Sequence, residues 1–233
     1  MDLADIPDLT HGPGAAAWPG VYPALVVDIR DPASQGRVKV TLPWAPDGGG
    51  ARYEAWARLA TLTAGRNRGS WFIPEVGDEV LVAFQGADES LPFVIGALWN
   101  GKGAPPVSMD GGGNNNLKSI VTRSGLKLEF NDFPGQESIR LLTPAGNRLE
   151  LKDGPGAVTI QDANGNVVRL DSDGIALLSS GSVRIDGSEV AINAGTIKLN
   201  TAVVECSGEI TGATLIVDSV VANSYTPGAG NIW

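Results

Sequence analysis

The chain has 233 residues, 17 of them basic and 26 acidic, which gives a formal net charge of -9. This balance argues against a protein that binds along nucleic acid, which needs clustered Lys and Arg, and the single cysteine excludes an intrachain disulfide framework. The acidic N-terminus lacks the features of a signal peptide, and no apolar run reaches the ~18 residues of a membrane span, so we expect assembly in the cytoplasm.

The first segment, residues 1–17, is predicted to be an irregular N-terminal arm. It is rich in Pro, Gly and Ala, and arms of this kind become ordered against a partner or not at all. The chain as a whole has 31 Gly and 15 Pro and no apolar run at helical spacing. These features predict an all-β fold.

Residues 18–101 are predicted to form a small five-stranded barrel. Turn residues separate five strand-like runs, and the turn Asp31 to Gly36 joins the first two. The runs are Val21–Arg30, Arg37–Trp44, Tyr53–Leu62, Glu79–Phe84 and Pro92–Trp99. Five strands in about 80 residues suit the OB fold. Five tryptophans in or beside this segment are expected to fill the barrel: Trp18, Trp44, Trp56, Trp71 and Trp99.

Several short motifs of this segment occur together and in a fixed order. They are Asp31-Pro32, Gly36-Arg37-Val38-Lys39-Val40, Leu42-Pro43-Trp44, Trp56-Ala57-Arg58, Pro74-Glu75-Val76-Gly77-Asp78-Glu79-Val80 and Pro92-Phe93-Val94-Ile95-Gly96. In these residues the chain resembles the OB domain of contractile-tail central spikes, the family of phage baseplate assembly protein V and VgrG. The resemblance implies a structural protein that works with a separate hub protein at its OB end and with tube and baseplate proteins.

Residues 102–118 are rich in Gly, Pro and Asn and are predicted to be a linker. Beyond it, apolar-x-apolar pairs recur, and both members of such a pair lie on one face of an extended strand. The pairs are Leu126/Leu128, Ile139/Leu141, Leu149/Leu151, Val158/Ile160, Val168/Leu170, Ile175/Leu177, Val183/Ile185, Val190/Ile192, Ile197/Leu199, Val204/Cys206 and Leu215/Val217. Turn residues between the pairs complete the pattern of a β-solenoid.

Residues 119–226 are predicted to form an intertwined, triple-stranded β-helix needle made by three copies of the chain. No aromatic residue lies between Phe133 and Tyr225, so the interior must be thin, and strands this short cannot bury a core alone. A monomeric β-helix is the alternative, and it usually has longer coils and a wider core. The expected trimer core is Val183, Ile185, Val190, Ile192, Ile197, Leu199, Val204 and Cys206.

The last seven residues, 227–233, are predicted to form a blunt tip. The resemblance implies that this end seats a PAAR-type tip protein, with Ile232 and Trp233 as apolar anchors. The alternative is that Trp233 merely plugs the end of the trimer. The residues expected to contact the tip protein are Pro227, Gly228, Gly230, Asn231, Ile232 and Trp233.

No catalytic, cofactor-binding or metal-binding residue is predicted. Glu75, Asp78 and Glu79 could form an acid/base pair for glycoside cleavage, but their spacing also suits a turn into a barrel strand. The loop from Asp162 to Asn166 is similar to a calcium turn but lacks the full repeat pattern. The only histidine, His11, lies in the arm, and the resemblance places the iron site of some phage spikes on histidines of the needle, which this needle lacks.

The leading hypothesis is therefore a central spike that punctures membranes, with transient contact to the target membrane and no nucleic acid partner. Two hypotheses from other classes remain: a polysaccharide-degrading enzyme on a β-helix, and an OB-fold oligonucleotide binder. The enzyme would need charged residues that converge in a groove. The oligonucleotide binder would show an electrophoretic shift at low salt, which the net charge of -9 does not favour.

Overall fold

The computed structural model describes residues 18–46, 52–153 and 157–224. The predicted arm and the predicted tip lie outside the described residues. The chain divides into one unit that ends at Gly181 and a second that begins at Ser182. Within the described residues, no helix has the length and apolar character needed to cross a lipid bilayer.

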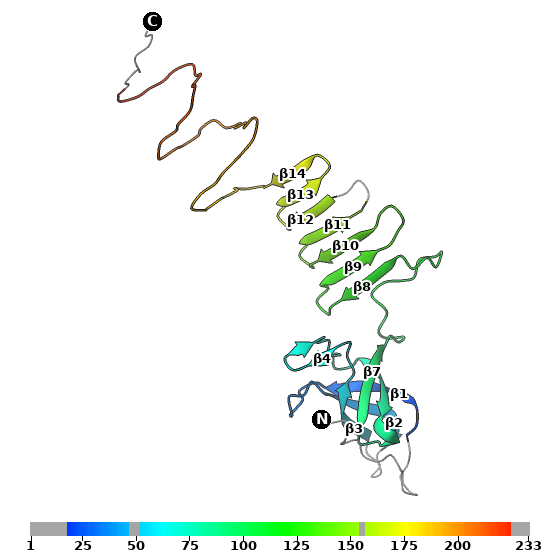
Figure 1. Ribbon diagram of the computed structural model, residues 1–233. Helices are drawn as coiled ribbons and strands as arrows, with labels where there is room; N and C mark the ends of the chain where they lie inside the picture. Colours follow the sequence, from blue (N-terminus) through cyan, green and yellow to red (C-terminus); the bar gives the residue numbers. More distant parts are fainter. Residues whose placement is uncertain (1–17, 47–51, 154–156, 225–233) are drawn as a thin grey trace. The chain divides into compact units, whose positions relative to one another are not determined.

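Five strands form the closed barrel that the sequence predicts. They are β1 (Val21–Asp28), β2 (Val38–Pro46), β3 (Arg52–Leu59), β6 (Glu79–Phe84) and β7 (Pro92–Leu98). The strands close in the order β1-β2-β3-β7-β6 (Figure 1). All neighbours are antiparallel except β3 and β7, which run parallel. This is the OB topology. A short hairpin, β4 (Ala64–Gly65) and β5 (Arg68–Gly69), and the 3-10 turn η2 (Gln85–Ala87) lie in the connections.

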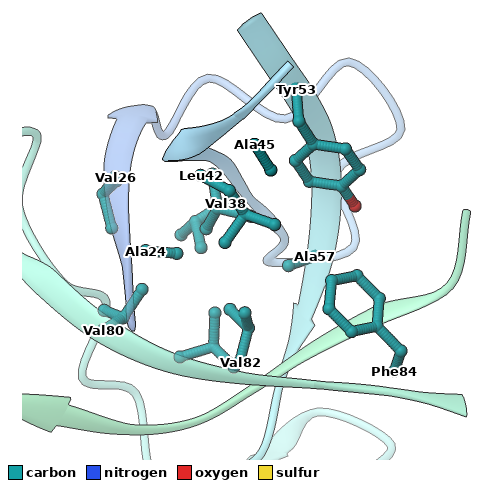
Figure 2. Close-up of a cluster of buried hydrophobic side chains, with 12 residues drawn as sticks. Ala24, Val26, Val38, Leu42, Ala45, Tyr53, Ala57, Val80, Val82 and Phe84 are labelled. Atoms are coloured by element: carbon teal, nitrogen blue, oxygen red, sulfur yellow. The ribbon is translucent and has the colours of Figure 1, made fainter. Parts of the chain in front are cut away.

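Branched aliphatic side chains form most of the barrel core, and the prediction that tryptophans fill it is wrong for Trp71 and Trp99. The side chain of Trp44 lies outside the described structure. Figure 2 shows Val26, Val38, Leu42, Val80 and Val82, which come from β1, β2 and β6, converging in the interior, and each is at most 1% exposed. Alternation explains which residues form the core, because strand positions of one parity point inward. Tyr53 and Phe84 are the two aromatic residues of this buried cluster.

Trp71 and Trp99 lie at the periphery of the barrel instead. Trp71 is 74% exposed and Trp99 is 71% exposed, because both follow the ends of strands rather than inward positions. The Trp71 ring lies over Gly36, where an added Cβ would come within 2.9 Å of the ring. Trp18 packs partly buried against the core, 5.4 Å from the Phe84 ring and 6.0 Å from the Tyr53 ring. Trp18 therefore covers the core where the chain enters the barrel.

The β1–β2 loop is organised by the carboxylate of Asp31. This side chain is 5% exposed and accepts hydrogen bonds from the backbone N–H groups of Ala33, Gln35 and Arg37. The Arg37 guanidinium donates a further bond of 2.7 Å to it. These donors favour the ionised carboxylate, so they hold the pKa of Asp31 well below its usual range, with the Arg37 bond as the largest cause.

We expect Asp31→Asn to weaken the barrel at neutral pH and to flatten its acid sensitivity. A carboxylate with a lowered folded-state pKa contributes stability above its unfolded pKa of about 3.9 and loses it as pH falls through the folded value. The wild-type melting temperature should thus fall steeply below about pH 4, and that of D31N should fall less. Scanning calorimetry from pH 7 to pH 2 measures both curves.

Asp28→Asn is the matched control for this experiment. The hydrogen bond from Arg30 lowers the pKa of Asp28 to about 2, but the Arg30 side chain is 88% exposed, and exposed pairs of this kind contribute little. The D28N curve should remain close to wild type. Equal losses in D28N and D31N would contradict the organising role of Asp31.

The second part of the unit that ends at Gly181 is one seven-stranded antiparallel sheet. Consecutive strands pair, so the sheet is a meander in which the strands lie side by side (Figure 1). The strands are β8 (Leu117–Val121), β9 (Lys127–Asn131), β10 (Ser138–Leu142), β11 (Arg148–Lys152), β12 (Ala157–Gln161), β13 (Val167–Asp171) and β14 (Gly174–Leu178). The predicted strands around Leu128 to Leu177 are thereby confirmed, and β8 adds one that begins inside the predicted linker.

Strand pairing differs along the segment predicted to be intertwined. From β8 to β14 the chain pairs with itself, because two- to six-residue corners are long enough to return a strand beside its predecessor. From Ser182 to Ser224, all of which the structure describes, no strand forms within the chain. Strands whose partners are other chains would show no ladder in one chain, so intertwining of this stretch remains a prediction.

Candidate functional site

One face of the sheet is apolar across all seven strands. Residues directly opposite one another share a face, and two continuous rows result. One row is Ile120, Leu128, Leu141, Leu149, Ile160, Val168 and Leu177, and the other is Phe130, Ile139, Leu151, Val158, Leu170 and Ile175. We call these two rows the apolar face. Most of its side chains are exposed in the single chain, from 36% for Val158 to 77% for Ile175.

The opposite face carries the charged side chains of the central strands, and Leu142, Val167 and Leu178 also lie on it. Its middle row places Glu129, Arg140 and Glu150 directly opposite one another on β9, β10 and β11. Arg140 Nε lies 2.7 Å from Glu150 Oε1, and Arg140 Nη1 lies 3.4 Å from Glu129 Oε1. Lys127 also pairs with Glu129, and Arg148 lies 3.8 Å from Glu150. We call these five residues the ion ladder.

The ion ladder is the more enclosed of the two faces. The Glu129 side chain is 8% exposed and the Glu150 side chain 14% exposed, whereas Leu141 on the apolar face is 48% exposed. A one-layer sheet cannot bury its apolar face by itself, since a stable domain needs at least two packed layers. Covering the exposed part of these side chains would contribute on the order of 10 kcal/mol per chain. The apolar face is therefore the interaction surface of the sheet.

The residues of the predicted trimer core, which follow the sheet in the chain, are also exposed in the single chain. Val183, Val190 and Ile197 are 53%, 54% and 55% exposed, and Ile185, Ile192, Leu199 and Val204 lie between 63% and 70%. Cys206 is also exposed in the single chain. The described residues of the chain do not bury any of these side chains, and their burial between copies stays a prediction.

The carboxylates weighed as catalytic or calcium-binding hold turns. Asp78 accepts a hydrogen bond from the backbone N–H of Glu75, and Glu79 accepts one from the Asn100 amide. Asp162 accepts bonds from the backbone and side-chain N–H groups of Asn164 and Asn166. Both Asp162 oxygens are thus engaged by the loop, which lowers the pKa of this carboxyl, chiefly through the Asn166 amide.

The sequence prediction missed the ion ladder. The signal was present, because the charged residues alternate with the apolar ones along each strand and must therefore share the other face. These residues are Lys127, Glu129, Arg140, Arg148 and Glu150. Which charges meet depends on the strand register, however, and corners of unequal length do not reveal it. Among the described residues, no cluster of three or more His, Cys, Asp or Glu could hold a metal ion.

Comparison with known families matches both parts of the chain. Residues 22–99 match the type VI secretion system/phage-baseplate injector OB domain, which covers the five-stranded barrel. Residues 138–198 match the phage baseplate V C-terminal trimerisation domain, which covers β10 to β14 and continues beyond Gly181. The trimerisation domain supports a homotrimer.

The chain is also similar to type VI secretion system spike proteins, although it spans less than a fifth of their length. It is 31% identical to VgrG1a of Pseudomonas aeruginosa over 100 residues, which are 42% of this chain and 16% of that protein. It is 35% identical to VgrG2a of the same organism over 153 residues, which are 60% of this chain and 18% of that protein. VgrG3 of Vibrio cholerae is 32% identical over 110 residues, 46% of this chain and 11% of that protein.

The barrel topology, the unpartnered apolar face and these matches lead to one assignment: the chain belongs to the family of phage baseplate V and VgrG-like spike proteins, with an OB domain followed by a C-terminal trimerisation domain.

Proposed function

We propose that this protein is the central spike of a contractile injection particle, a phage tail or an injection system. Three copies assemble in the cytoplasm as part of the baseplate, and contraction drives the spike outward through the target membrane. The observation that carries the proposal is the apolar face, which runs without interruption across seven strands and has no cover within the described residues of the chain. Its role is structural rather than enzymatic.

The architecture suits a part that transmits force along its length. When three apolar faces close on one another, each strand is held by backbone hydrogen bonds at its sides and by apolar packing behind it. Failure then requires many interstrand bonds to break together, rather than one at a time. The ion ladder adds a second set of cross-strand links on the side away from the packed face.

The OB end is the proposed attachment point for the rest of the particle. Trp18, the first described residue, is held by a 3.0 Å hydrogen bond from its backbone N–H to the Ala87 carbonyl and packs on the barrel core. The arm that precedes Trp18 therefore joins the protein at a fixed point. We infer that the arm and the barrel contact a separate hub protein, and through it the tube.

The C-terminal end is the proposed seat of a PAAR-type tip protein, through Pro227, Gly228, Gly230, Asn231, Ile232 and Trp233. We expect that deletion of residues 227–233 abolishes co-purification of the tip protein with the spike, because it removes the two large apolar side chains of the end. Pull-down from cells that produce both proteins measures the loss. The deletion should leave the trimer intact, since the apolar face lies upstream.

A narrower change separates the two roles weighed for Trp233. Trp233→Ala should weaken tip binding at least about tenfold if the indole is an anchor of the interface. If Trp233 only plugs the trimer end, W233A should bind the tip protein normally and lower the melting temperature of the spike alone. Retention of the tip protein after deletion of all seven residues would contradict the proposed seat.

A further inference from the structure

Three corners of the sheet repeat one turn and lie at the same ends of successive strand pairs. They begin at Thr122, Thr143 and Asp162, and in each the first residue donates its backbone N–H to the carbonyl four residues later. A glycine in the fourth position donates back to the first residue, as Gly146 does to Thr143 over 3.0 Å. Because the three corners share the same backbone hydrogen bonds, they differ in the side-chain contacts that each makes.

Two of these corners end in an asparagine that binds the next segment of chain. Asn147 closes the second corner, and its side-chain oxygen accepts the backbone N–H of Ala163 in the third corner at 3.1 Å. Asn166 closes the third corner, and its side-chain oxygen accepts the backbone N–H of Ser180 at 3.2 Å. Each asparagine thus holds the next segment in place.

The two asparagines differ in what they hold. Ala163 belongs to a corner between two strands of the sheet, whose ladder would fix it in any case. Ser180 follows β14, the last strand of the sheet, and within the described part of the chain only β13 pairs with β14. Asn166 also accepts a bond from Ser179 Oγ at 3.0 Å, and Ser180 Oγ donates to the Asn164 carbonyl at 3.1 Å. The exit from the sheet is therefore fastened by side chains.

The Asn166 side chain is itself held in one orientation. Its amide Nδ2 donates a 2.7 Å hydrogen bond to Asp162 Oδ2, and its backbone N–H donates 2.8 Å to Asp162 Oδ1. These bonds leave Asn166 Oδ1 directed to the residues after β14. The corner is accordingly a preformed clasp, which we define as Asp162, Asn166 and the Ser179–Ser180 pair.

Beyond the clasp the chain changes its pattern of pairing. Apolar pairs continue at Val183/Ile185, Val190/Ile192 and Ile197/Leu199, seven residues apart, with no strand in the chain. The matched trimerisation domain runs from residue 138 to residue 198 and so includes both sides of the clasp. The free edge of β14 is a template for another strand, and the available partner is a second copy of this chain.

We propose that Asn166 is a positioning residue that sets where the chain stops pairing with itself and starts to pair with second copies. The clasp fixes the chain at Ser179 and Ser180, so that the pairs from Val183 onward begin at one height in all three copies. This inference rests on the proposed trimer. Without the clasp, the repeated apolar pairs allow a copy to slip by one repeat and still bury apolar side chains.

The test uses Asn166→Ala with Asn147→Ala as its matched control. Cys206 is the only cysteine, and three copies in register place three Cys206 residues at one height. Because Cys206 belongs to the expected trimer core, a small oxidant such as diamide should join two of these thiols as a disulfide in wild type. In N166A we expect linking to slow, and tryptic cleavage after Arg184 to speed up, by about fivefold each, because the variant loses the side-chain hydrogen bonds of Asn166 to Asp162, Ser179 and Ser180. N147A should match wild type in both readouts.

Sedimentation of the same samples distinguishes the possible failures. A wild-type protein that sediments as a single chain overturns the trimer and the clasp together. If N166A is trimeric and is linked and cleaved at wild-type rates, the clasp alone is overturned. The same holds if the linking and cleavage rates of N147A change as much as those of N166A. If N166A fails to fold, Ser179→Ala removes the clasp bond from Ser179 Oγ to Asn166, together with the bond from the Gly181 N–H to the same oxygen, and leaves the residues of the corner in place. A slower linking rate in S179A supports the clasp, and wild-type behaviour in both readouts overturns it.

Discussion

Leu151→Asp is expected to convert the spike from a trimer to a single chain. Leu151 lies in the second row of the apolar face on β11, opposite Ile139 and Val158. It is 43% exposed in the single chain, so an aspartate there is tolerated until three copies meet. The trimer would then bury three uncompensated charges, at a cost on the order of 10 kcal/mol. Sedimentation velocity at micromolar concentration measures the change.

The neighbouring residue supplies the control. Lys152→Asp introduces the same side chain one position along the same strand, where it points to the polar face opposite Ser138 and Ala157. K152D should remain a trimer. A trimeric L151D, or the loss of the trimer in both variants, would show that the apolar face does not form the interface.

Arg140→Met is expected to have the second largest effect, on the stability of the sheet. The substitution leaves the Glu129 and Glu150 carboxylates opposite the same apolar side chain, with Lys127 and Arg148 as their remaining cations. Removal of one partner from an enclosed ion pair costs 3–5 kcal/mol when burial is complete, and Arg140 is 36% exposed, so we expect about 2 kcal/mol per chain. Urea unfolding followed by circular dichroism measures the loss without adding salt.

Two further variants test the cause of that loss. Arg169→Met breaks a 2.7 Å pair with Asp171, but the Arg169 side chain is 48% exposed, so the cost should stay below about 1 kcal/mol. The triple variant R140M/E129Q/E150Q removes the stranded charges and should recover most of the stability that R140M loses. A triple variant as unstable as R140M would indicate lost packing rather than unpaired charge.

Much of the fold follows from alternation and turn residues alone. The five barrel strands and the strands from Leu128 to Leu177 appear where apolar residues alternate between Gly, Asn and Asp corners. Alternation fixes which side chains share a face, and for this reason the apolar face could be predicted. It does not say which strand lies next to which, so self-pairing in β8 to β14 and pairing between copies give the same sequence pattern.

The barrel interior shows a second limit of sequence reasoning. Trp71 and Trp99 follow strand ends, and a count of large apolar residues cannot tell such positions from inward ones. Val and Leu side chains at alternate strand positions form most of the core instead. The ion ladder escaped prediction for a related reason, since the meeting of Glu129 with Arg140 depends on the register between β9 and β10.

The meander could gain or lose strands in pairs without disturbing the two rows of the apolar face. Two adjacent strands with their two corners form a unit that begins and ends on the same side and returns both rows to the same face. Insertion or removal of one unit changes the length by about 10 Å, two strand spacings, and leaves the barrel, both rows and the ends as they were. Duplication or loss of about 20 codons would therefore lengthen or shorten the sheet by one unit and leave its two faces intact.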